Sequence, residues 1–380
     1  MTSSDSFAIV TGDFVPTGGM DRANYALASY LARSGHPVEL VTHRASPELS
    51  ALAGVRVRAA RKPFGSYFLG RWPLRWEAAR CAREAPKRVV ANGGNFTSND
   101  INWVHYVHAA FRPTASASLA RRLKGRVERF IELRAERAAL HAARIVVCNS
   151  ERTRSDVINL CGVDPARAVV VYYGTDPDQF RPATEHERTE LRAKFGWPAD
   201  RPVVMFIGAL GDRRKGFDTL FTAWSALCQE PGWDPVLAVV GRGAELPAWE
   251  ERVREAGLVD RVRFLGFRSD VPELLRAADA LVAPTRYEAY GLGVHEALCC
   301  GLPAMVSVSA GVAERYLEGL ADLLLPDPDD AADLAGRLRR WRADPAAVRD
   351  RVRAVSDALR AITWDSMGRN FVKAVGAVLN

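Results

Sequence analysis

The sequence lacks the features that mark several large classes of protein. None of its six cysteines belongs to a C-x-x-C pair, which argues against a zinc site or a disulfide framework and favours a reducing compartment. No apolar run approaches the roughly 18 residues that a membrane-spanning helix needs. The first residues contain no basic region followed by an apolar stretch of signal-peptide length. We therefore expect a cytoplasmic protein, with peripheral attachment to the inner face of the cytoplasmic membrane as the alternative.

What the sequence does have is an uneven distribution of charge. The net charge is +7, and residues 1–180 contain 25 Lys and Arg against 16 Asp and Glu, whereas residues 181–380 contain 27 against 29. A basic first half favours anionic partners such as phosphates, acidic glycans or lipid headgroups. No nucleic-acid recognition motif accompanies the charge, so no nucleic-acid partner is expected.

Two basic segments of the first half are open to more than one interpretation. Residues 61–76 mix cations with aromatics, which fits a wall of a substrate-binding site, a contact with an anionic membrane, or a loop whose aromatics pack inward. Residues 119–144 predict a helix with many arginines, for which a solvated face is the better interpretation.

Apolar segments alternate with helical patterns twice along the chain. Continuous runs rich in Val, Ile and Ala are typical of strands buried on both faces of a parallel sheet. In the first half these runs occur at 6–14, 38–43, 88–94, 101–109, 144–150 and 168–174. After a polar stretch they recur at 202–210, 236–243, 261–267, 280–285 and 303–309.

This repetition predicts an α/β protein with two doubly wound, Rossmann-like domains facing a central cleft. The expected boundaries are 1–180 and 181–363. Open parallel sheets bind ligands beyond the carboxyl ends of their strands. The residues that directly follow each strand are therefore the candidates for chemistry.

Two strand-end turns carry the residues expected to bind phosphates. Gly18 and Gly19 lie between the first strand and a helix start, where glycines let the backbone approach an anion; a tight turn without a ligand explains them equally well. In the second half, Arg213, Arg214 and Lys215 stand between a strand end and a helix start. Three cations beside the positive end of a helix suit a diphosphate, and a solvated basic loop is the alternative.

The most specific segment is 284–298, which contains two glutamates eight residues apart. Glu288 falls in the loop after a strand, and Glu296 falls about one turn inside the helix that begins at Gly291–Gly293. A phosphate on this helix start would have one carboxylate on each side, so Glu296 can bind ribose hydroxyls and Glu288 those of a sugar. One capping and one solvated glutamate is the structural alternative. The residues expected to bind this phosphate, ribose and sugar are Glu288, Tyr290, Gly291, Leu292, Gly293 and Glu296.

With these motifs the sequence resembles the retaining glycosyltransferases of family 4, over nearly the whole chain. The motifs that carry the resemblance are, in order, Pro16-Thr-Gly-Gly19, Gly35-His-Pro-Val38, Val107-His108, Asn149-Ser150, Tyr173-Gly-Thr-Asp176 with Phe180, Arg214-Lys-Gly216, Phe264-Leu-Gly266, Glu288 to Glu296, and Gly301-Leu-Pro303. The resemblance implies the GT-B fold, a nucleotide diphosphate sugar as donor, and transfer with retention. It also implies that a last helix at 364–380 packs back onto the first domain.

The resemblance assigns roles to single residues. Lys215 matches the lysine that binds the diphosphate, Glu288 the glutamate at the donor sugar, and Glu296 the glutamate at the ribose. His108 matches the histidine near the sugar carbon that is attacked. Lys215, Glu288 and His108 are therefore the expected catalytic residues.

The sequence also departs from the family at one position. The glycine loop near the phosphates matches Gly18 and Gly19, as in the family. The family usually has Arg directly after the strand-end glycine, however, and this sequence has Ala209 there. Arg213 or Arg214, in the same loop, is the candidate to supply the missing guanidinium.

The expected reaction moves a hexose-type sugar from a UDP- or GDP-sugar to a hydroxyl of a glycan, glycolipid or small acceptor. Lys215, an arginine of its loop and the helix N-termini can stabilise the leaving diphosphate, so neither a metal nor a cofactor is expected. As is proposed for the family, the leaving phosphate would accept the acceptor's proton on the front face. Glu288 as a covalent nucleophile is the alternative. Arg268 is expected near the base of the nucleotide.

Three further hypotheses remain beside this one. The pairs Asp176–Asp178 and Asp327–Asp329 resemble metal ligands, but each flanks a proline in a turn-rich stretch. A sugar-nucleotide epimerase of the same fold would release a free epimerised donor. A non-catalytic protein docked on anionic membrane would bind liposomes without consuming any donor.

Overall fold

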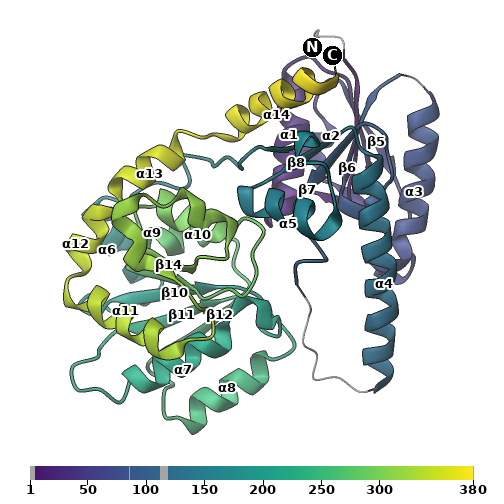
Figure 1. Ribbon diagram of the computed structural model, residues 1–380. Helices are drawn as coiled ribbons and strands as arrows, with labels where there is room; N and C mark the ends of the chain where they lie inside the picture. The colour runs from purple at the N-terminus through teal and green to yellow at the C-terminus, as the bar shows by residue number, and fades with distance from the viewer. Residues whose placement is uncertain (1–4, 85, 112–118, 380) are drawn as a thin grey trace. The chain divides into compact units, whose positions relative to one another are not determined.

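A computed structural model describes residues 5–84, 86–111 and 119–379, and the chain divides into two compact units (Figure 1). Unit 1 consists of Met1–Gly174 and Ile362–Asn380, and unit 2 consists of Thr175–Ala361. The boundaries expected from the sequence, at 180 and 363, lie six and two residues after those of the structure.

Strands and helices alternate along both units. The strands are β1 (Phe7–Val10), β2 (Asp13–Phe14), β3 (Val38–Thr42), β4 (Arg44–Ala45), β5 (Val55–Ala59), β6 (Arg88–Asn92), β7 (Ile101–Val104), β8 (Ile145–Cys148), β9 (Ala168–Val170), β10 (Val203–Ile207), β11 (Val236–Val240), β12 (Val262–Gly266), β13 (Ala280–Ala283), β14 (Ala304–Ser307) and β15 (Leu324–Leu325). The α-helices are α1 (Met20–Arg33), α2 (Pro47–Ser50), α3 (Tyr67–Glu84), α4 (Leu119–Ala142), α5 (Glu151–Cys161), α6 (Glu185–Lys194), α7 (Phe217–Leu227), α8 (Leu246–Glu255), α9 (Val271–Ala277), α10 (Leu292–Cys299), α11 (Ala331–Ala343), α12 (Pro345–Arg351), α13 (Arg353–Arg360) and α14 (Trp364–Leu379).

Unit 1 is built on a seven-stranded sheet in the order β5-β3-β1-β6-β7-β8-β9, with parallel neighbours throughout. Strands β1, β7 and β8 are buried at every residue, which explains their continuous apolar sequences. The strand order reverses between β1 and β6. At such a reversal the loops that follow the two strands leave in opposite directions, and a ligand can bind between them.

Unit 2 repeats the plan with six parallel strands in the order β12-β11-β10-β13-β14-β15. Its strand order reverses between β10 and β13, so the loops after these two strands flank the corresponding ligand position. The predicted α/β class and the two doubly wound, Rossmann-like sheets are therefore confirmed.

Strand β5 is missing from the set of strands expected from the sequence, because its residues alternate Val with Arg instead of forming a continuous apolar run. It is an edge strand of the sheet, and all five of its side chains are exposed or half-buried. Arg58 uses this position to donate from Nε to Glu39 of β3 at 2.7 Å. A polar edge strand of this kind also discourages pairing with a second sheet.

The last helix, α14, belongs to unit 1 and lies along α1 (Figure 1). The ring of Phe371 lies 5.2 Å from that of Trp103 on β7, between centroids. The ring of Trp364 lies 6.2 Å from that of Tyr173. The C-terminal segment therefore contributes to the core of the first unit, although it follows the whole of unit 2 in sequence.

Candidate functional site

The loop after β10 in unit 2 holds the three cations expected to bind phosphate. Asp212 begins a short 3-10 turn, Arg213–Lys215, and its Oδ1 accepts the backbone N–H of Arg214 at 3.1 Å. The same carboxylate accepts the Arg214 side chain, from Nε to Oδ2, at 3.1 Å. This turn fixes the direction in which each of the three cations leaves the backbone.

Gly216 allows this loop to pass directly against the loop that follows β13. It has φ +73°, and a Cβ atom placed on it would lie 1.8 Å from the carbonyl oxygen of Pro284. Two of the hydrogen bonds between the loops end on one carbonyl: the backbone N–H of Arg286 and the hydroxyl of Thr285 both donate to the carbonyl of Arg214, at 2.8 and 2.9 Å. The close approach therefore depends on a residue without a side chain.

Lys215 and Arg214 converge on Glu288 at this junction. Nζ of Lys215 donates to Oε2 of Glu288, and a guanidinium nitrogen of Arg214 lies 3.6 Å from the same oxygen. Burial raises the pKa of Glu288, but Lys215 and Arg214 together outweigh burial and lower it below its ordinary value. Between 17% and 24% of each of the three side chains is exposed, so an anionic ligand can still reach the two cations.

The helix that starts beyond Glu288 is arranged as the sequence predicts. Gly291, at φ +107°, is the N-cap of α10 and has no side chain with which to satisfy the first N–H groups of the helix. Glu296 lies inside α10 and is 6% exposed. The hydroxyl of Tyr290 is 2.7 Å from Nδ1 of His295, and both residues are buried. This helix start offers backbone donors to an anion, with Leu292 and Gly293 as its first two residues.

Two of the expected donor residues of unit 2 face other partners. Arg213 forms an ion pair with Asp218 at 3.0 Å and is half-exposed, so it does not join the cluster on Glu288. Arg268, after β12, forms an ion pair with Asp270 through its Nε at 2.8 Å. Arg286 is a residue that sequence reasoning missed: its guanidinium binds Asp218 at 2.9 Å and also pairs with Asp329. Only its position after a strand end could have indicated it.

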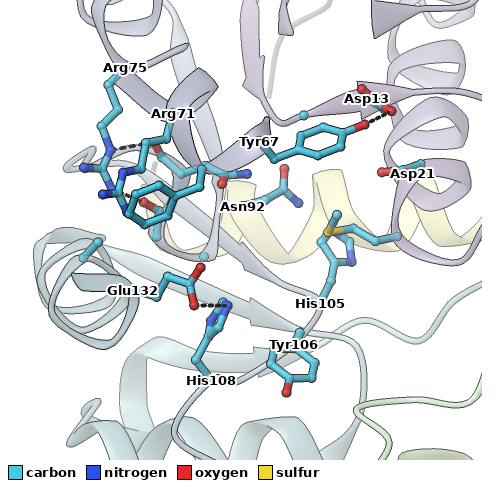
Figure 2. Close-up of a pocket in the computed structure, with 17 residues that line it drawn as sticks. Asp13, Asp21, Tyr67, Arg71, Arg75, Asn92, His105, Tyr106, His108 and Glu132 are labelled. Atoms are coloured by element: carbon cyan, nitrogen blue, oxygen red, sulfur yellow. Dashed lines mark hydrogen bonds and ion pairs between the residues drawn. The ribbon is translucent and has the colours of Figure 1, made fainter. Parts of the chain in front are cut away.

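Unit 1 contains a pocket of about 530 Å³ (Figure 2). Its walls come from the ends of β1, β6 and β7 and from helices α1, α3 and α4, which places it at the reversal of strand order. The lining residues are Gly12, Asp13, Met20, Asp21, Tyr67, Phe68, Arg71, Arg75, Asn92, Gly93, Gly94, Asn95, His105, Tyr106, His108, Glu132 and Ala135. Of the expected site residues, His108 lines this pocket.

Glu136 orients the ring of His108. Its Oε1 accepts both the backbone N–H of His108, at 3.0 Å, and the ring Nδ1–H, at 2.9 Å. Glu132 lies 3.9 Å from Nε2 on the pocket side of the ring (Figure 2). Burial lowers the pKa of His108, but Glu136 and Glu132 outweigh it and raise the pKa above its ordinary value. Because the carboxylate of Glu136 can only accept, Nδ1 carries the hydrogen of this bond, and Nε2 faces the pocket beside Glu132.

Carboxylates line the opposite part of the same pocket. Oδ2 of Asp13 accepts from Arg44 at 2.6 Å and from the hydroxyl of Tyr67 at 2.7 Å. Burial and the neighbouring charge of Asp13 raise the pKa of Asp21 to about 6, against the opposing effect of Arg44. Sequence reasoning missed Asp13, Asp21 and Arg44, although Asp13 follows a strand end. Tyr67 lies in the segment 61–76, for which a wall of a substrate-binding site was one of the interpretations.

Gly18 and Gly19 lie at the start of α1 in unit 1, as expected. Gly18 has φ +82°, and a Cβ atom on it would lie 3.7 Å from Oδ2 of Asp21. Gly19 is the N-cap of α1 and is exposed. These glycines and His108 belong to unit 1, whereas the other expected site residues belong to unit 2.

The two acidic pairs weighed as metal ligands act within turns. Oδ1 of Asp176 accepts the backbone N–H of Asp178 at 3.0 Å, and Oδ1 of Asp327 accepts that of Asp329 at 2.8 Å. Within 5–84, 86–111 and 119–379, no three His, Cys, Asp or Glu side chains are grouped as metal ligands would be. In the same ranges, no helix is both long and apolar enough to cross a membrane.

Both halves of the chain match known protein families. Residues 187–358 match the family described as glycosyl transferases group 1, and residues 17–179 match glycosyltransferase family 4. The D-inositol 3-phosphate glycosyltransferase of Kineococcus radiotolerans is 30% identical over 376 residues, which cover 88% of this chain and 84% of that protein. The enzyme of the same description from Mycobacterium tuberculosis is 29% identical over 398 residues, which cover 96% of this chain and 80% of that protein.

Solved structures share the fold. Sucrose-phosphate synthase from Thermosynechococcus elongatus superimposes with a TM-score of 0.79 at 23% identity, over 99% of both chains. HepE from Anabaena, solved with UDP and glucose, superimposes with a TM-score of 0.73 at 20% identity, over 98% of this chain and 100% of that one. This likeness shows the GT-B fold of two Rossmann-like units.

Proposed function

Since the chain belongs to the family 4 glycosyltransferases, we propose that it moves a hexose-type sugar from a UDP- or GDP-sugar to a hydroxyl with retention of configuration. The acceptor is a glycan, a lipid-linked glycan or a small hydroxylated molecule. The convergence of Lys215 and Arg214 on Glu288, at the reversal of strand order in unit 2, carries the proposal.

In this proposal the diphosphate binds to Lys215, to Arg214 and to the N-terminus of α10. The ion pairs with Glu288 open or are shared when the diphosphate arrives, because a second anion competes for the same cations. Glu288 then accepts hydrogen bonds from the donor sugar, and Glu296 accepts them from the ribose. Arg214 takes the place of the guanidinium missing at Ala209, because Arg213 is engaged by Asp218.

The proposed reaction breaks the bond between the sugar's anomeric carbon and the diphosphate oxygen and forms one to the acceptor oxygen. The leaving phosphate takes the acceptor's proton on the face from which it departs. Charge on the leaving group is stabilised by Lys215, Arg214 and the α10 N–H groups, so the reaction needs no metal. We place the acceptor in the pocket of unit 1, where Nε2 of His108 can form a hydrogen bond with an acceptor or sugar hydroxyl, donating it when the ring is charged and accepting it when the ring is neutral.

We further propose that unit 1 touches the surface of an anionic membrane. Phe64 is 97% exposed, and Trp72 and Trp76 of α3 are more than half exposed. Arg80 stacks over Trp76 with its guanidinium carbon 5.8 Å from the ring centroid. Aromatics that stand beside cations on one helix suit the boundary between lipid headgroups and acyl chains.

The test begins with a thermal-shift panel of UDP-, GDP-, ADP-, CDP- and TDP-sugars to identify the donor. Release of the nucleoside diphosphate is then measured for Lys215→Ala and Glu288→Ala. Each should fall by at least about 10²-fold, the scale for losing one charge-stabilising group. Lys194→Ala and Glu273→Ala are matched controls, because these residues form a lysine–glutamate pair on the surface of the same unit.

Other outcomes would identify the alternatives. Near-normal turnover in both site variants would refute the assignment of the site. A free epimerised nucleotide sugar as the product would indicate an epimerase, and liposome binding without any donor consumption would indicate a binding protein. Activity should persist in excess EDTA, and its complete loss there would contradict the proposed departure of the diphosphate without a metal.

A further inference from the structure

Arg71, on α3, presents an unused cation to the pocket of unit 1. Its Nε and one terminal nitrogen are buried and have no hydrogen-bond partner. Among the residues that the structure describes, no carboxylate lies within ion-pair distance of its guanidinium. The group is held in place instead by two rings of its own helix, with its central carbon 3.8 Å from the centroid of Phe68 and 4.2 Å from that of Trp72. Buried donors without acceptors cost free energy unless a ligand satisfies them.

Arg75, one turn further along α3, lies beside Arg71 but is already engaged. It donates from Nε to the carbonyl of Asn95 at 3.2 Å and from a terminal nitrogen to that of Gly94 at 2.7 Å. Burial and the charge of Arg71 lower the pKa of Arg75 below its ordinary value. Two guanidinium groups that lie side by side and are partly buried repel each other. An anion bound in the pocket beside them would reduce that repulsion.

The far side of the pocket has the opposite character. Figure 2 shows Arg71 and Arg75 on one side and Asp13 and Asp21 on the other, with Asn92 between them. Oδ1 of Asn92 and Oδ1 of Asp13 are buried acceptors without a partner, in side chains that are 4% and 3% exposed. Glu132 is the remaining carboxylate of the lining, and it faces His108. The pocket therefore offers unused donors at one end and unused acceptors at the other.

We infer that the acceptor is a hydroxylated anion whose phosphate or carboxylate group binds Arg71 and whose hydroxyls bind Asn92 and Asp13. This inference depends on the proposed function only in identifying the bound anion as the acceptor. The existence of the anion site does not depend on the proposed function. A planar guanidinium donates two parallel hydrogen bonds to either oxyanion, so both groups share one recognition chemistry. Arg75 acts as a positioning residue that holds the turn after β6 against α3.

A footprint of the wild-type chain tests the site directly. Phenylglyoxal modifies accessible arginines, and mass spectrometry reports the rate at each one. Inorganic phosphate or acetate should slow modification of Arg71 at least about threefold, whereas glucose, which has hydroxyls but no charge, should not. Arg80 is the internal control, because it lies on the same helix, is exposed and faces Glu84 at 3.4 Å. Equal rates at Arg71 with and without both anions would overturn the inference.

Calorimetry then shows whether the site prefers a ligand with a phosphate group or one with a carboxylate group. Glucose 6-phosphate and glucuronate are titrated into the full chain with UDP present, so that the nucleotide site is occupied. Arg71→Gln should weaken binding of the preferred anion about 10-fold or more. Arg71→Lys should weaken it less, because lysine keeps the positive charge but cannot donate the two parallel hydrogen bonds of a guanidinium. Arg80→Gln should bind like wild type. Equal binding by wild type and Arg71→Gln, or binding of neither anion by wild type at about 1 mM, the upper end of typical KM values, would refute the inference.

The nucleotide reports on the proposed function separately. UDP or GDP should raise the melting temperature of wild type and of Arg71→Gln equally, which also shows that the variant is folded. If the chain binds the anion through Arg71 but binds no nucleotide, the anion site is supported and the proposed glycosyltransferase function is contradicted. If the chain binds nucleotide normally but binds neither anion, the proposed function is retained and the anion site is refuted.

Discussion

At the scale of single residues, the chemistry available to His108 depends on Glu136. The carboxylate of Glu136 is almost completely buried and accepts two hydrogen bonds from His108, one from the backbone and one from the ring. Such a carboxylate fixes the ring orientation and favours the charged imidazolium. The result is a histidine whose Nε2 faces the pocket and whose pKa lies above its ordinary value.

We expect Glu136→Gln to lower the pKa of His108, because a neutral amide no longer stabilises the imidazolium. Glu132→Gln should lower it less, since that carboxylate is 3.9 Å away and more exposed. The raised pKa means that the pair stabilises the fold most below pH 6.5, the ordinary value, and that this contribution is lost as pH rises through the folded-state pKa. NMR titration of the His108 ring measures both shifts. An unchanged pKa in Glu136→Gln would contradict the assignment.

Adjacent residues can also differ completely in use. Arg213 and Arg214 are neighbours in sequence, yet one pairs with Asp218 and the other lies beside Glu288. The 3-10 turn after Asp212 sends successive side chains in different directions. Their identical chemistry could not distinguish them in the sequence, where both were candidates for the guanidinium missing at Ala209.

At the scale of elements, the candidate donor site exists because two loops meet at one reversal of strand order. The loops after β10 and β13 are about 70 residues apart in sequence, and parallel pairing of their strands brings their ends together. Gly216 allows the two loops to come into contact, because a side chain at this position would overlap the carbonyl of Pro284. The ion pair between Lys215 and Glu288 is a consequence of this contact.

Gly216→Ala should therefore destabilise unit 2 and reduce donor turnover together. The positive φ alone costs about 1–2 kcal/mol for a residue with a Cβ, and relieving the overlap adds about 1–3 kcal/mol. Gly257→Ala is the matched control, since Gly257 has φ +67° and no atom within 4 Å of a Cβ position. Urea unfolding measures both variants. Equal losses of stability would show that the loops do not depend on this close approach.

At the scale of the whole molecule, the charge is divided between the two units. The excess of cations lies in residues 1–180, which also contain the exposed aromatics Phe64, Trp72 and Trp76. Phe64 has φ +52°, an uncommon conformation for a residue with a side chain, and is nevertheless almost fully exposed. Exposed apolar groups with a basic surround favour an anionic lipid surface over water.

Liposome sedimentation tests this membrane contact. The chain should bind vesicles that contain anionic phosphatidylglycerol, bind neutral phosphatidylcholine vesicles weakly, and be released by added salt, because salt screens the attraction. Phe64→Ala with Trp76→Ala should reduce binding several-fold, as each aromatic contributes buried apolar area. Phe267→Ala removes an exposed aromatic from unit 2 and serves as the control. Equal binding to neutral and anionic vesicles would contradict the proposal.

The sequence by itself determined the α/β class, the two doubly wound sheets and the segments that follow their strands. Strands buried on both faces must be apolar throughout, and residues at strand ends must meet where the order reverses, so Lys215, Glu288 and the start of α10 could be located in advance. The family resemblance added the expected roles. Strand β5 was not predicted, because an edge strand can alternate Val with Arg and so lacks the continuous apolar run used to identify the other strands.

Only the tertiary structure decided which side chains share a pocket. Arg71 and Asp13 lie 58 positions apart in sequence and belong to different elements, yet they line opposite sides of one cavity. Their sequence surroundings, a basic aromatic helix and a short strand, do not distinguish an inward side chain from a solvated one. Direction and partnership depend on how α3 packs against the sheet, because a long arginine side chain can reach either solvent or the interior from the same backbone position.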